Sequence, residues 1–477
     1  MKMRKVLSGF FHSLANAFDS AKISTRRGNP PGSSPTDASN ELNSYTRNEL
    51  VRRARYLEKN SGHIRGTLRD MKVYGIGEGI KPNAKTDNSS WNRDAEDFFK
   101  MWGLRCDITN RFSFRECQAM VSRALEVDGE IFVIKTYNSN KEPRIQLMET
   151  HRLVSEYEGD NVENGIEFGK YGEPLWYYFK GKDDASVRKI PAHAVIHVFE
   201  PERPSYVRAF PGIQHSILDV LDRNEILSLE KHKVKLISDI ARIITSENIT
   251  TADNGDFSAG IEGAASLEST NSADIEKKFG GKSFRLYPGE KLEAFESNIP
   301  SPTFTGFLAE LQRSSSLGVL PYEFAIDPSA VGGAGVRLVL SKAQRYIDDR
   351  GRTLDERFNF PIWMFVIGHA MARGLLASQH GWHRVTWTHP KRATVDAGRE
   401  EQQNRLNVES GLKTMEMAYS ELGLDFEDEM QTRANNARHI MRLAGIPDSE
   451  PIPLWMLYKP QGSQVIQIDN NNNDDEK

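Results

Sequence analysis

The chain has 477 residues and a mass of 54.0 kDa, which is too long for a single compact core, so its length predicts two or more folding units. Hydrophobic residues make up 38% of the chain, and no run reaches the roughly 18 apolar residues of a membrane span, so we expect no membrane partner. The net charge of -4 is unevenly spread: residues 1–60 carry eleven Lys and Arg against five Asp and Glu, and residues 421–477 carry five against eleven. Such ends suit different partners, although two solvated tails explain them equally well.

The N-terminal region shows no export-signal pattern. The apolar part of "MKMRKVLSGFFHSLANAF" is short and is interrupted by polar residues from His12 onwards, which favours a small amphipathic helix. The chain has two cysteines, Cys106 and Cys117, so we expect a protein that is made and used in a reducing cytosol. Residues 24–40 combine Gly, Pro, Ser and charge without apolar anchors, which indicates a flexible linker.

Residues 46–215, which follow a flexible arm over residues 1–45, predict a mixed α/β region. A basic helix, "ELVRRARYLEKN", leads into a glycine-punctuated segment, and Trp91 and Trp102 space aromatic side chains along another helix. The next segment predicts a helix, a turn at Gly129 and a β-branched strand, and "RIQLMETHRLV" and "AHAVIHVFE" predict further strands.

A long helix is expected over residues 216–249, where no Pro or Gly interrupts the chain. Val220, Leu227 and Val234 recur every seven residues, and thirty or so helical residues span roughly 45 Å at 1.5 Å each. Such a helix suits a strut packed beside copies of itself, and a plain buried helix explains the pattern equally well.

Residues 250–299 predict an insertion that leaves the body of the protein, because small residues, nine acids and five bases replace the apolar pattern, with short strands at "SFRLYPG" and "LEAFE". The remaining segments follow in chain order: a second helix over 300–320, a glycine-rich segment and a long helix through Asp349–Phe365 within 321–393, helices over 394–447, and a tail over 448–477 that ends in low-complexity sequence typical of disorder.

Two glycine-containing segments partly match the patterns of nucleotide-binding loops. "DPSAVGGAGVRLVLSKAQR", residues 327–345, begins a GxGxxG pattern, but Leu338 stands where the third small residue is needed and no parallel-type strand leads into it. "GGKS", residues 280–283, ends like a P-loop, but Glu276 stands where its first glycine is needed. We therefore expect neither dinucleotide nor ATP binding, and no cofactor.

Metal and catalytic motifs are weak as well. His193 and His197 have the spacing of a helical zinc motif, but Ala194 replaces its glutamate and the β-branched segment favours a strand. The two cysteines lack a second pair, and no GxSxG elbow occurs, so we expect no metal ligand and no catalytic residue. Carboxylates are abundant, but the sequence alone does not group them into a site. A nuclease therefore stays an alternative.

The chemistry that remains for residues 327–345 is contact with a phosphate backbone. Glycines permit positive φ and a close approach to a ligand, and basic residues follow them on a helix whose buried stripe is Val336, Val339, Leu340, Ala343 and Ile347. Such contacts carry no sequence information. A solvated helix face behind a flexible connector is the alternative. The candidate contact residues are Gly332, Gly333, Gly335, Arg337, Lys342 and Arg345.

Several segments, taken in order over roughly residues 45–435, resemble the portal proteins of tailed bacteriophages, specifically the lambda-type family. One departure is that family members usually have a Ser/Tyr-rich segment ending in Ala-Arg where this chain has "AVGGAGVR". The segments that carry the resemblance are "RARYLEKNSGHIRGTLRDMKVYGIGEGIKP", "VSRALEVDGEIFVIK", "IQLMETHRL", "IPAHAVIHVFEPERPSYVRAFPGI", "FTGFLAELQRSSSLGVLPYEFAIDPS" and "WTHPKRATVDAGREEQQNRLNVESGLKTMEMAYSELGLDFEDEM".

The resemblance implies a mixed α/β, mainly α, portal-type fold that assembles as a ring, similar to family rings of twelve copies around an axial channel. The family architecture implies these assignments: a wing over 46–215, stem helices over 216–249 and 300–320, a clip over 250–299, a tunnel loop and wing helix over 321–393, and a helical crown over 394–447.

The resemblance also implies a place and partners. The ring is expected in the virion, at one vertex of a shell of major capsid protein, after assembly in the host cytoplasm. Double-stranded DNA is expected to pass through it without sequence preference during packaging and ejection. The terminase large subunit, and later head-completion or adaptor proteins, are expected at the clip. No enzymatic activity is implied.

DNA that slides through a channel must bind it weakly. Each phosphate contact adds about -0.9 to the slope of log binding constant against log salt concentration. The net charge of -4, with Arg345 and Arg350 close in sequence to Asp348 and Asp349, predicts weak contact. Two alternatives are a nuclease or ATPase of the packaging process, and another minor capsid or head-completion protein that forms no closed ring.

Overall fold

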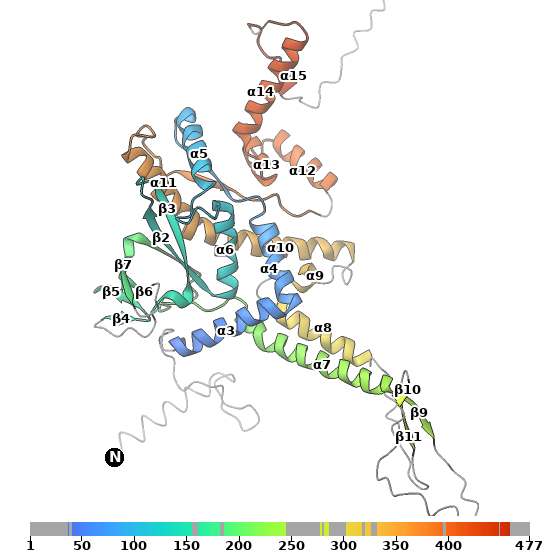
Figure 1. The fold of residues 1–477 in the computed structure, drawn as a ribbon. Coiled ribbons are helices and arrows are strands. Elements are labelled where there is room, and N and C mark those ends of the chain that lie inside the picture. The colour runs from blue at the N-terminus through green and yellow to red at the C-terminus, as the bar shows by residue number, and fades with distance from the viewer. Residues whose placement is uncertain are drawn as a thin grey trace, which may run out of the picture.

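The computed structural model describes residue 37 and residues 41–154, 161–181, 186–244, 277–278, 281–285, 302–316, 320–325, 332–394, 397–447 and 449–457. The fold is mixed α/β and mainly helical, which confirms the predicted class. An α/β body lies at the centre, a pair of helices projects from one end of it, and the C-terminal helices lie at the opposite end (Figure 1). Most of the predicted N-terminal arm, most of the 250–299 insertion and the end of the tail lie outside the described residues.

The body begins with helices whose N-termini are capped by the side chain of the preceding residue. Each start follows a residue whose side chain accepts a backbone N–H, and at Ser113 a capping box with Glu116 is complete. Trp91 and Trp102 are both buried, so the predicted aromatic spacing is confirmed. The elements are α3 (Ser44–Asn60), α4 (Gly62–Gly75), β1 (Lys81–Ala84), α5 (Ser89–Gly103) and α6 (Phe114–Val127).

Two antiparallel sheets complete the body, with strand orders β3-β2-β8 and β4-β5-β6-β7. Strand β2 is buried on both faces: Ile131 and Val133 face the helices, whereas Phe132 and Ile134 face the second sheet, because successive side chains of a strand point to opposite sides. This explains why the sequence shows a continuous apolar run there. The strands are β2 (Glu130–Tyr137), β3 (Pro143–Glu149), β4 (Val162–Glu163), β5 (Ile166–Phe168), β6 (Pro174–Lys180), β7 (Val187–Pro191) and β8 (Val195–Phe199).

Gly129 makes the predicted turn between α6 and β2, with φ of +81°. A Cβ atom at this position would lie 2.3 Å from the carbonyl carbon and oxygen of Phe210. The turn therefore requires glycine both for its backbone conformation and for the close approach of the neighbouring chain.

A pair of packed helices, α7 (Ile217–Asp239) and α8 (Pro302–Ser316), projects from the body (Figure 1). The prediction of a helix over 216–249 is too long. After Asp239 the chain forms strand β9 (Ile240–Ile244), because the β-branched run "IARII" favours an extended backbone. Strand β11 (Gly281–Arg285) pairs with β9 and with the short β10 (Lys277–Lys278), so part of the predicted strand "SFRLYPG" is confirmed.

The chain returns to the body through α9 (Tyr322–Ala325) and a long helical segment. This segment consists of α10 (Gly333–Leu354), a π-helical turn over Asp355–Asn359, and α11 (Phe360–Ala372). Pro361 supplies no backbone N–H, and the π-helical turn precedes it. The predicted helix through Asp349–Phe365 is confirmed with this irregularity.

Strand β12 (Val385–Thr388) pairs with β1, and short helices follow it. They pack in sequence order, α12 against α13, α13 against α14 and α14 against α15. The prediction of helices over 394–447 is confirmed, with turns between them. The helices are α12 (Ala397–Glu409), α13 (Met415–Glu421), α14 (Phe426–Leu443) and α15 (Leu454–Leu457).

Candidate nucleic-acid interface

The predicted glycine-rich loop is in part the first turn of α10. Gly332 occupies the N-cap position with φ of -66°, and Gly333 and Gly335 lie within the helix. None of the three has positive φ, so the positive φ that glycine permits is not used here. Glycine in a helix costs roughly 0.5–1 kcal/mol relative to Ala, and α10 nevertheless begins at Gly333. Residues 326–331, the rest of the loop, lie outside the described residues.

The basic candidates lie together on one exposed face of α10. Arg337, Lys342 and Arg345 are all exposed, and Leu338 among them is 73% exposed. The opposite face carries the buried Ala343 and Ile347, which confirms that part of the predicted stripe, while Val336, Val339 and Leu340 are half-buried. Within the described part of the chain, Lys342 and Arg345 form no ion pair.

Ion pairs along the inward side of α10 fix the helix to the body. Arg350 donates from Nη2 to Glu126 at 2.6 Å and from Nη1 to Glu200 at 2.7 Å. Asp348 lies on the other side of the helix, between Arg337 and Arg345, and accepts from the exposed Arg392 at 3.1 Å. Arg350 therefore pairs with acids of other segments and not with Asp348 or Asp349, which stand beside it in sequence. Arg350 lies two turns after the buried Ala343, so it shares the inward face, and its partners belong to other segments.

A buried ionic cluster that sequence reasoning missed joins β2, β8 and the segments that carry Thr150 and Arg208. Glu130 is fully buried and accepts from Arg208 at 2.7 Å, from Thr150 at 2.6 Å and from the backbone N–H of Ala209 at 3.2 Å, and it lies 3.0 Å from His197 Nε2. Although burial alone raises a carboxyl pKa, Arg208 and His197 hold the pKa of Glu130 well below its usual range. His197 thus lies on a strand and has a structural partner.

No catalytic arrangement is found among the described residues. The part of the chain that the structure describes contains no cluster of His, Cys, Asp or Glu that could hold a metal ion. Cys106 and Cys117 are buried free thiols whose sulfur atoms lie 3.7 Å apart. Gly281, Lys282 and Ser283 lie in strand β11 and do not begin a helix, so the rejection of a P-loop is supported.

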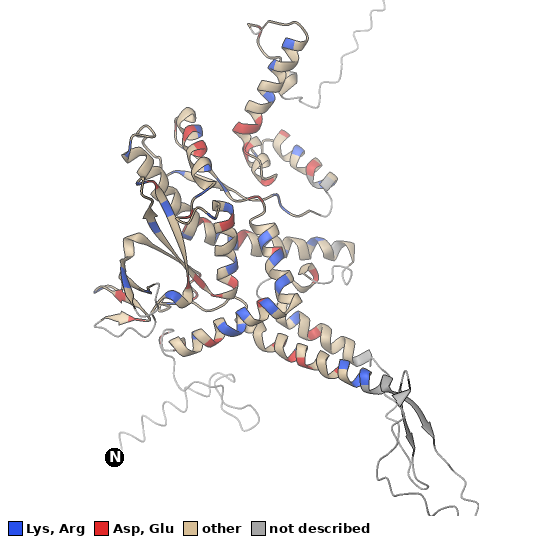
Figure 2. Cartoon of the chain, in the orientation of Figure 1, with Lys and Arg blue, Asp and Glu red and all other residues tan. Residues whose placement is uncertain are grey.

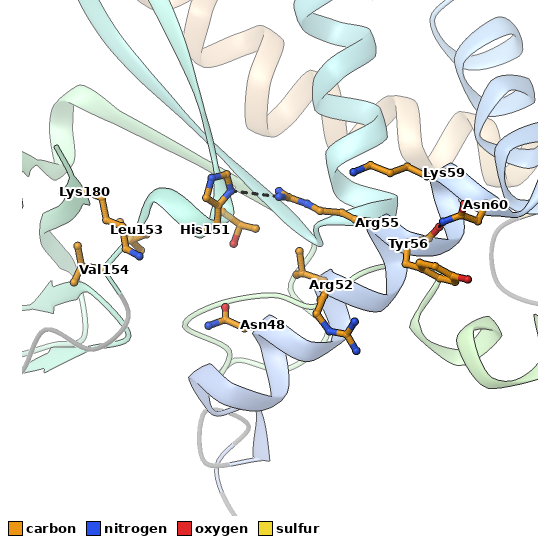
Figure 3. A pocket seen from close by; sticks show the side chains of 12 residues that line it. Asn48, Arg52, Arg55, Tyr56, Lys59, Asn60, His151, Leu153, Val154 and Lys180 are labelled. Carbon is orange, nitrogen blue, oxygen red and sulfur yellow. Dashed lines mark hydrogen bonds between the residues drawn. The ribbon is translucent and has the colours of Figure 1, made fainter. Parts of the chain in front are cut away.

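A basic groove lies beside α3, the helix whose basic residues were noted in the sequence, although its lining was not predicted. The basic groove is a cavity of about 550 Å³ between α3, the segment after β3 and the end of β6, with Arg52, Arg55, Tyr56, Lys59, His151 and Lys180 in its wall (Figure 3). Basic residues recur along α3 and α4 (Figure 2). Arg55 is held by Asp128 at 2.6 Å, whereas Lys59 and Lys180 form no ion pair with any described residue.

One family model matches more than half of the chain. The model of the family "Phage portal protein, lambda family" matches residues 25–350, so the chain belongs to the lambda family of phage portal proteins. Because this family is structural and not enzymatic, membership confirms the expectation that the chain is not an enzyme.

The relatives are distant. The chain is 27% identical over 192 residues to a "Probable portal protein" of Halomonas phage phiHAP-1, a match that covers 35% of this chain and 37% of that protein. A chain in the virion of the native gene transfer agent (GTA) particle is 12% identical, with a TM-score of 0.41 over 79% of this chain and 93% of that one. A chain in the neck of the empty GTA particle, computed with C6 symmetry, is also 12% identical, with a TM-score of 0.43 over 83% and 96%. Among the described residues, no helix is long and apolar enough to cross a membrane.

Proposed function

We propose that this chain forms the portal ring of a tailed phage: a closed assembly of identical subunits, expected to be twelve, at one vertex of the capsid in the virion. Family membership supports the proposal, and the α7–α8 pair that projects from the body is the structural observation that carries it. A two-helix projection with exposed leucines, such as Leu218 and Leu229, is suited to packing beside copies of itself.

In this proposal the segments take the roles that the resemblance implies. The α/β body is the wing, and α7, strand β9 after it and α8 are in the stem. Strands β10 and β11 lie in the clip, where the terminase large subunit and later head-completion or adaptor proteins dock. The C-terminal helices are the crown inside the head, and the major capsid protein surrounds the ring. The clip and the part of the tunnel loop before Gly332 fall largely outside the described residues.

Double-stranded DNA passes through the channel during packaging and ejection without sequence preference. The exposed face of α10 that carries Arg337, Lys342 and Arg345 is the proposed DNA contact, together with the helix start at Gly332. First-turn N–H groups of a helix and a few exposed cations attract phosphate weakly, which suits a conduit. A strongly cationic lining would retain the DNA.

Native mass measurement of the purified chain tests the proposal. We expect one dominant closed assembly whose mass is a fixed multiple of the subunit mass, with no nucleotide turnover and no cleavage of duplex DNA. A chain that remains monomeric in every buffer favours a different minor capsid or head-completion protein. Cleavage or turnover that co-purifies with the chain contradicts a passive conduit.

A further inference from the structure

A second charged surface of opposite sign lies on α7. Leu218, Asp222, Glu225 and Leu229, here called the acidic stripe, follow one another at helical spacing and share one face of the helix. Leu218 is 60% exposed and Leu229 is 63% exposed, and both carboxylates are exposed as well. Neither Asp222 nor Glu225 forms an ion pair with any described residue. The stripe is therefore two unpaired acids between two exposed leucines.

The basic groove has the complementary composition. Val51, Leu153 and Val154 form the apolar part of its lining, here called the floor. Lys59 and Lys180, which form no ion pair with any described residue, also line it (Figure 3). An occupant that places apolar side chains in the floor and carboxylates against the lysines satisfies both parts of this surface. The acidic stripe offers both parts, because it has two exposed leucines and, between them, two carboxylates.

A chain cannot place its own stripe in its own groove. Ala54 and Leu57 of α3 share a buried cluster with Ile217 and Val220 of α7, and this cluster joins the two helices. The groove residues lie on the face of α3 opposite to Ala54 and Leu57, and the acidic stripe likewise faces away from the cluster. The two surfaces therefore point away from each other within one subunit.

We infer that the acidic stripe of each subunit docks in the basic groove of the next subunit around the ring. This inference rests on the proposed ring. It is a contact between two different surfaces of the same chain, and contacts of this heterologous kind close into rings when the rotation between copies is suitable. The repeated contact holds the base of the α7–α8 pair of one subunit against α3 of its neighbour.

Duplex DNA is a poorer occupant of the basic groove. Phosphates are recognised by cations and backbone N–H groups, and they gain nothing from an apolar floor such as Val51 and Leu153. A cavity of about 550 Å³ accepts a few side chains, whereas a duplex presents a broad convex surface. Nucleic-acid binding is accordingly a separate outcome of the test.

Charge reversal in the full-length chain tests the inference. The groove variant is Lys59→Glu with Lys180→Glu, the stripe variant is Asp222→Lys with Glu225→Lys, and the third protein combines all four substitutions. Exposed lysines elsewhere, changed as Lys100→Glu with Lys170→Glu, give a control of the same charge change as the groove variant. Thermal unfolding and circular dichroism establish that each protein folds before its ring fraction is measured by native mass measurement.

We expect the groove variant and the stripe variant each to lower the ring fraction by about tenfold or more, because like charges then face each other across every contact. The combined variant is expected to regain rings, and the control to keep them. Rings that persist in both separate variants overturn the inference, as does a folded combined variant that forms none.

Two further results distinguish the docking inference from a failure of the proposed function and from nucleic-acid binding in the groove. If the unsubstituted chain forms no ring, the proposed function fails and the docking inference fails with it. If rings persist but Lys59→Glu with Lys180→Glu weakens binding of a fluorescent duplex, the groove is a nucleic-acid site and the docking inference is wrong.

Discussion

Arg350 Nη2 lies 2.6 Å from Glu126 Oε1, and this pair joins the C-terminal part of α10 to the C-terminal end of α6. Glu126 is 2% exposed, and the other arm of the guanidinium reaches Glu200 at 2.7 Å. Because the helix that carries the proposed DNA contacts is fixed at this point, its exposed face is held relative to the body.

Removing the Arg350 side chain is expected to destabilise the fold. Arg350→Ala leaves Glu126 buried without its cation, which costs about 3–5 kcal/mol for a buried pair broken on one side. Urea unfolding measures the loss. Arg352→Ala is the control, since Arg352 is exposed and only approaches Asp349 at 4.0 Å, and we expect a change within about 0.5 kcal/mol. Equal losses in the two variants contradict the anchoring role.

Glu96 is expected to make stability depend on pH. Burial, the largest cause, raises the pKa of Glu96 to about 7, the N–H of Ala84 opposes this, and Asp425, Asp428 and Glu427 of the C-terminal helices add to it. Between pH 4.5 and about 7 the folded chain holds a proton at Glu96 that the unfolded chain has released. The contribution of this group is thus complete below pH 4.5 and is lost as the pH rises through about 7.

Glu96→Gln removes that dependence. We expect little difference from the unsubstituted protein near pH 4.5 and a more stable variant at pH 8, by about 1–3 kcal/mol. Thermal unfolding over this pH range measures the difference, and Asp97→Asn, at an exposed neighbour, serves as the control. A difference that does not change with pH, or one that changes with the opposite sign, is incompatible with a buried protonated Glu96.

Gly129 is expected to tolerate no side chain. Gly129→Ala adds a Cβ atom 2.3 Å from the Phe210 backbone at a φ of +81°, so both a clash and backbone strain follow. Gly172→Ala is a matched control, because its φ is +79° but no atom lies within 4 Å of the added Cβ. We expect a loss of about 1–2 kcal/mol for the control and clearly more for Gly129→Ala in chemical denaturation. Similar losses indicate that the chain near Phe210 moves away without cost.

The exposed face of α10 is expected to set the salt dependence of DNA binding. Lys342→Ala with Arg345→Ala, measured on assembled rings with a short duplex, lowers affinity, and the log–log salt slope falls by about 0.9 for each phosphate contact removed. Lys170→Ala with Lys391→Ala removes the same charge at other exposed positions and is expected to leave the slope unchanged. Loss of rings in the α10 variant instead assigns Lys342 and Arg345 to subunit packing.

Local patterns predicted most of the secondary structure of the body. Three such predictions depend only on neighbours in sequence: the helix that spaces Trp91 and Trp102, the turn at Gly129, and the β-branched strand after it. The helix predicted over 216–249 ends too late, because the seven-residue recurrence of apolar residues was extended past Val234 into "IARII". The β-branched residues of that run favour a strand.

Long-range pairing explains the remaining errors. Arg350 pairs with Glu126 and Glu200, which are 224 and 150 residues away in sequence. Glu130 pairs with Arg208, 78 residues away. A single sequence carries no signal for pairs at such separations. The position of Arg350 two turns after Ala343 was nevertheless a usable sign that it faces inward. Glycine permits positive φ but does not require it, and α10 includes Gly333 and Gly335 with helical backbone.

Electron microscopy of the purified full-length chain tests the central claim most directly. The account predicts closed rings with one rotational symmetry and a central hole wide enough for a DNA duplex, with the exposed face of α10 turned toward that hole. Particles that show only single chains, or closed assemblies with no axial opening, contradict it.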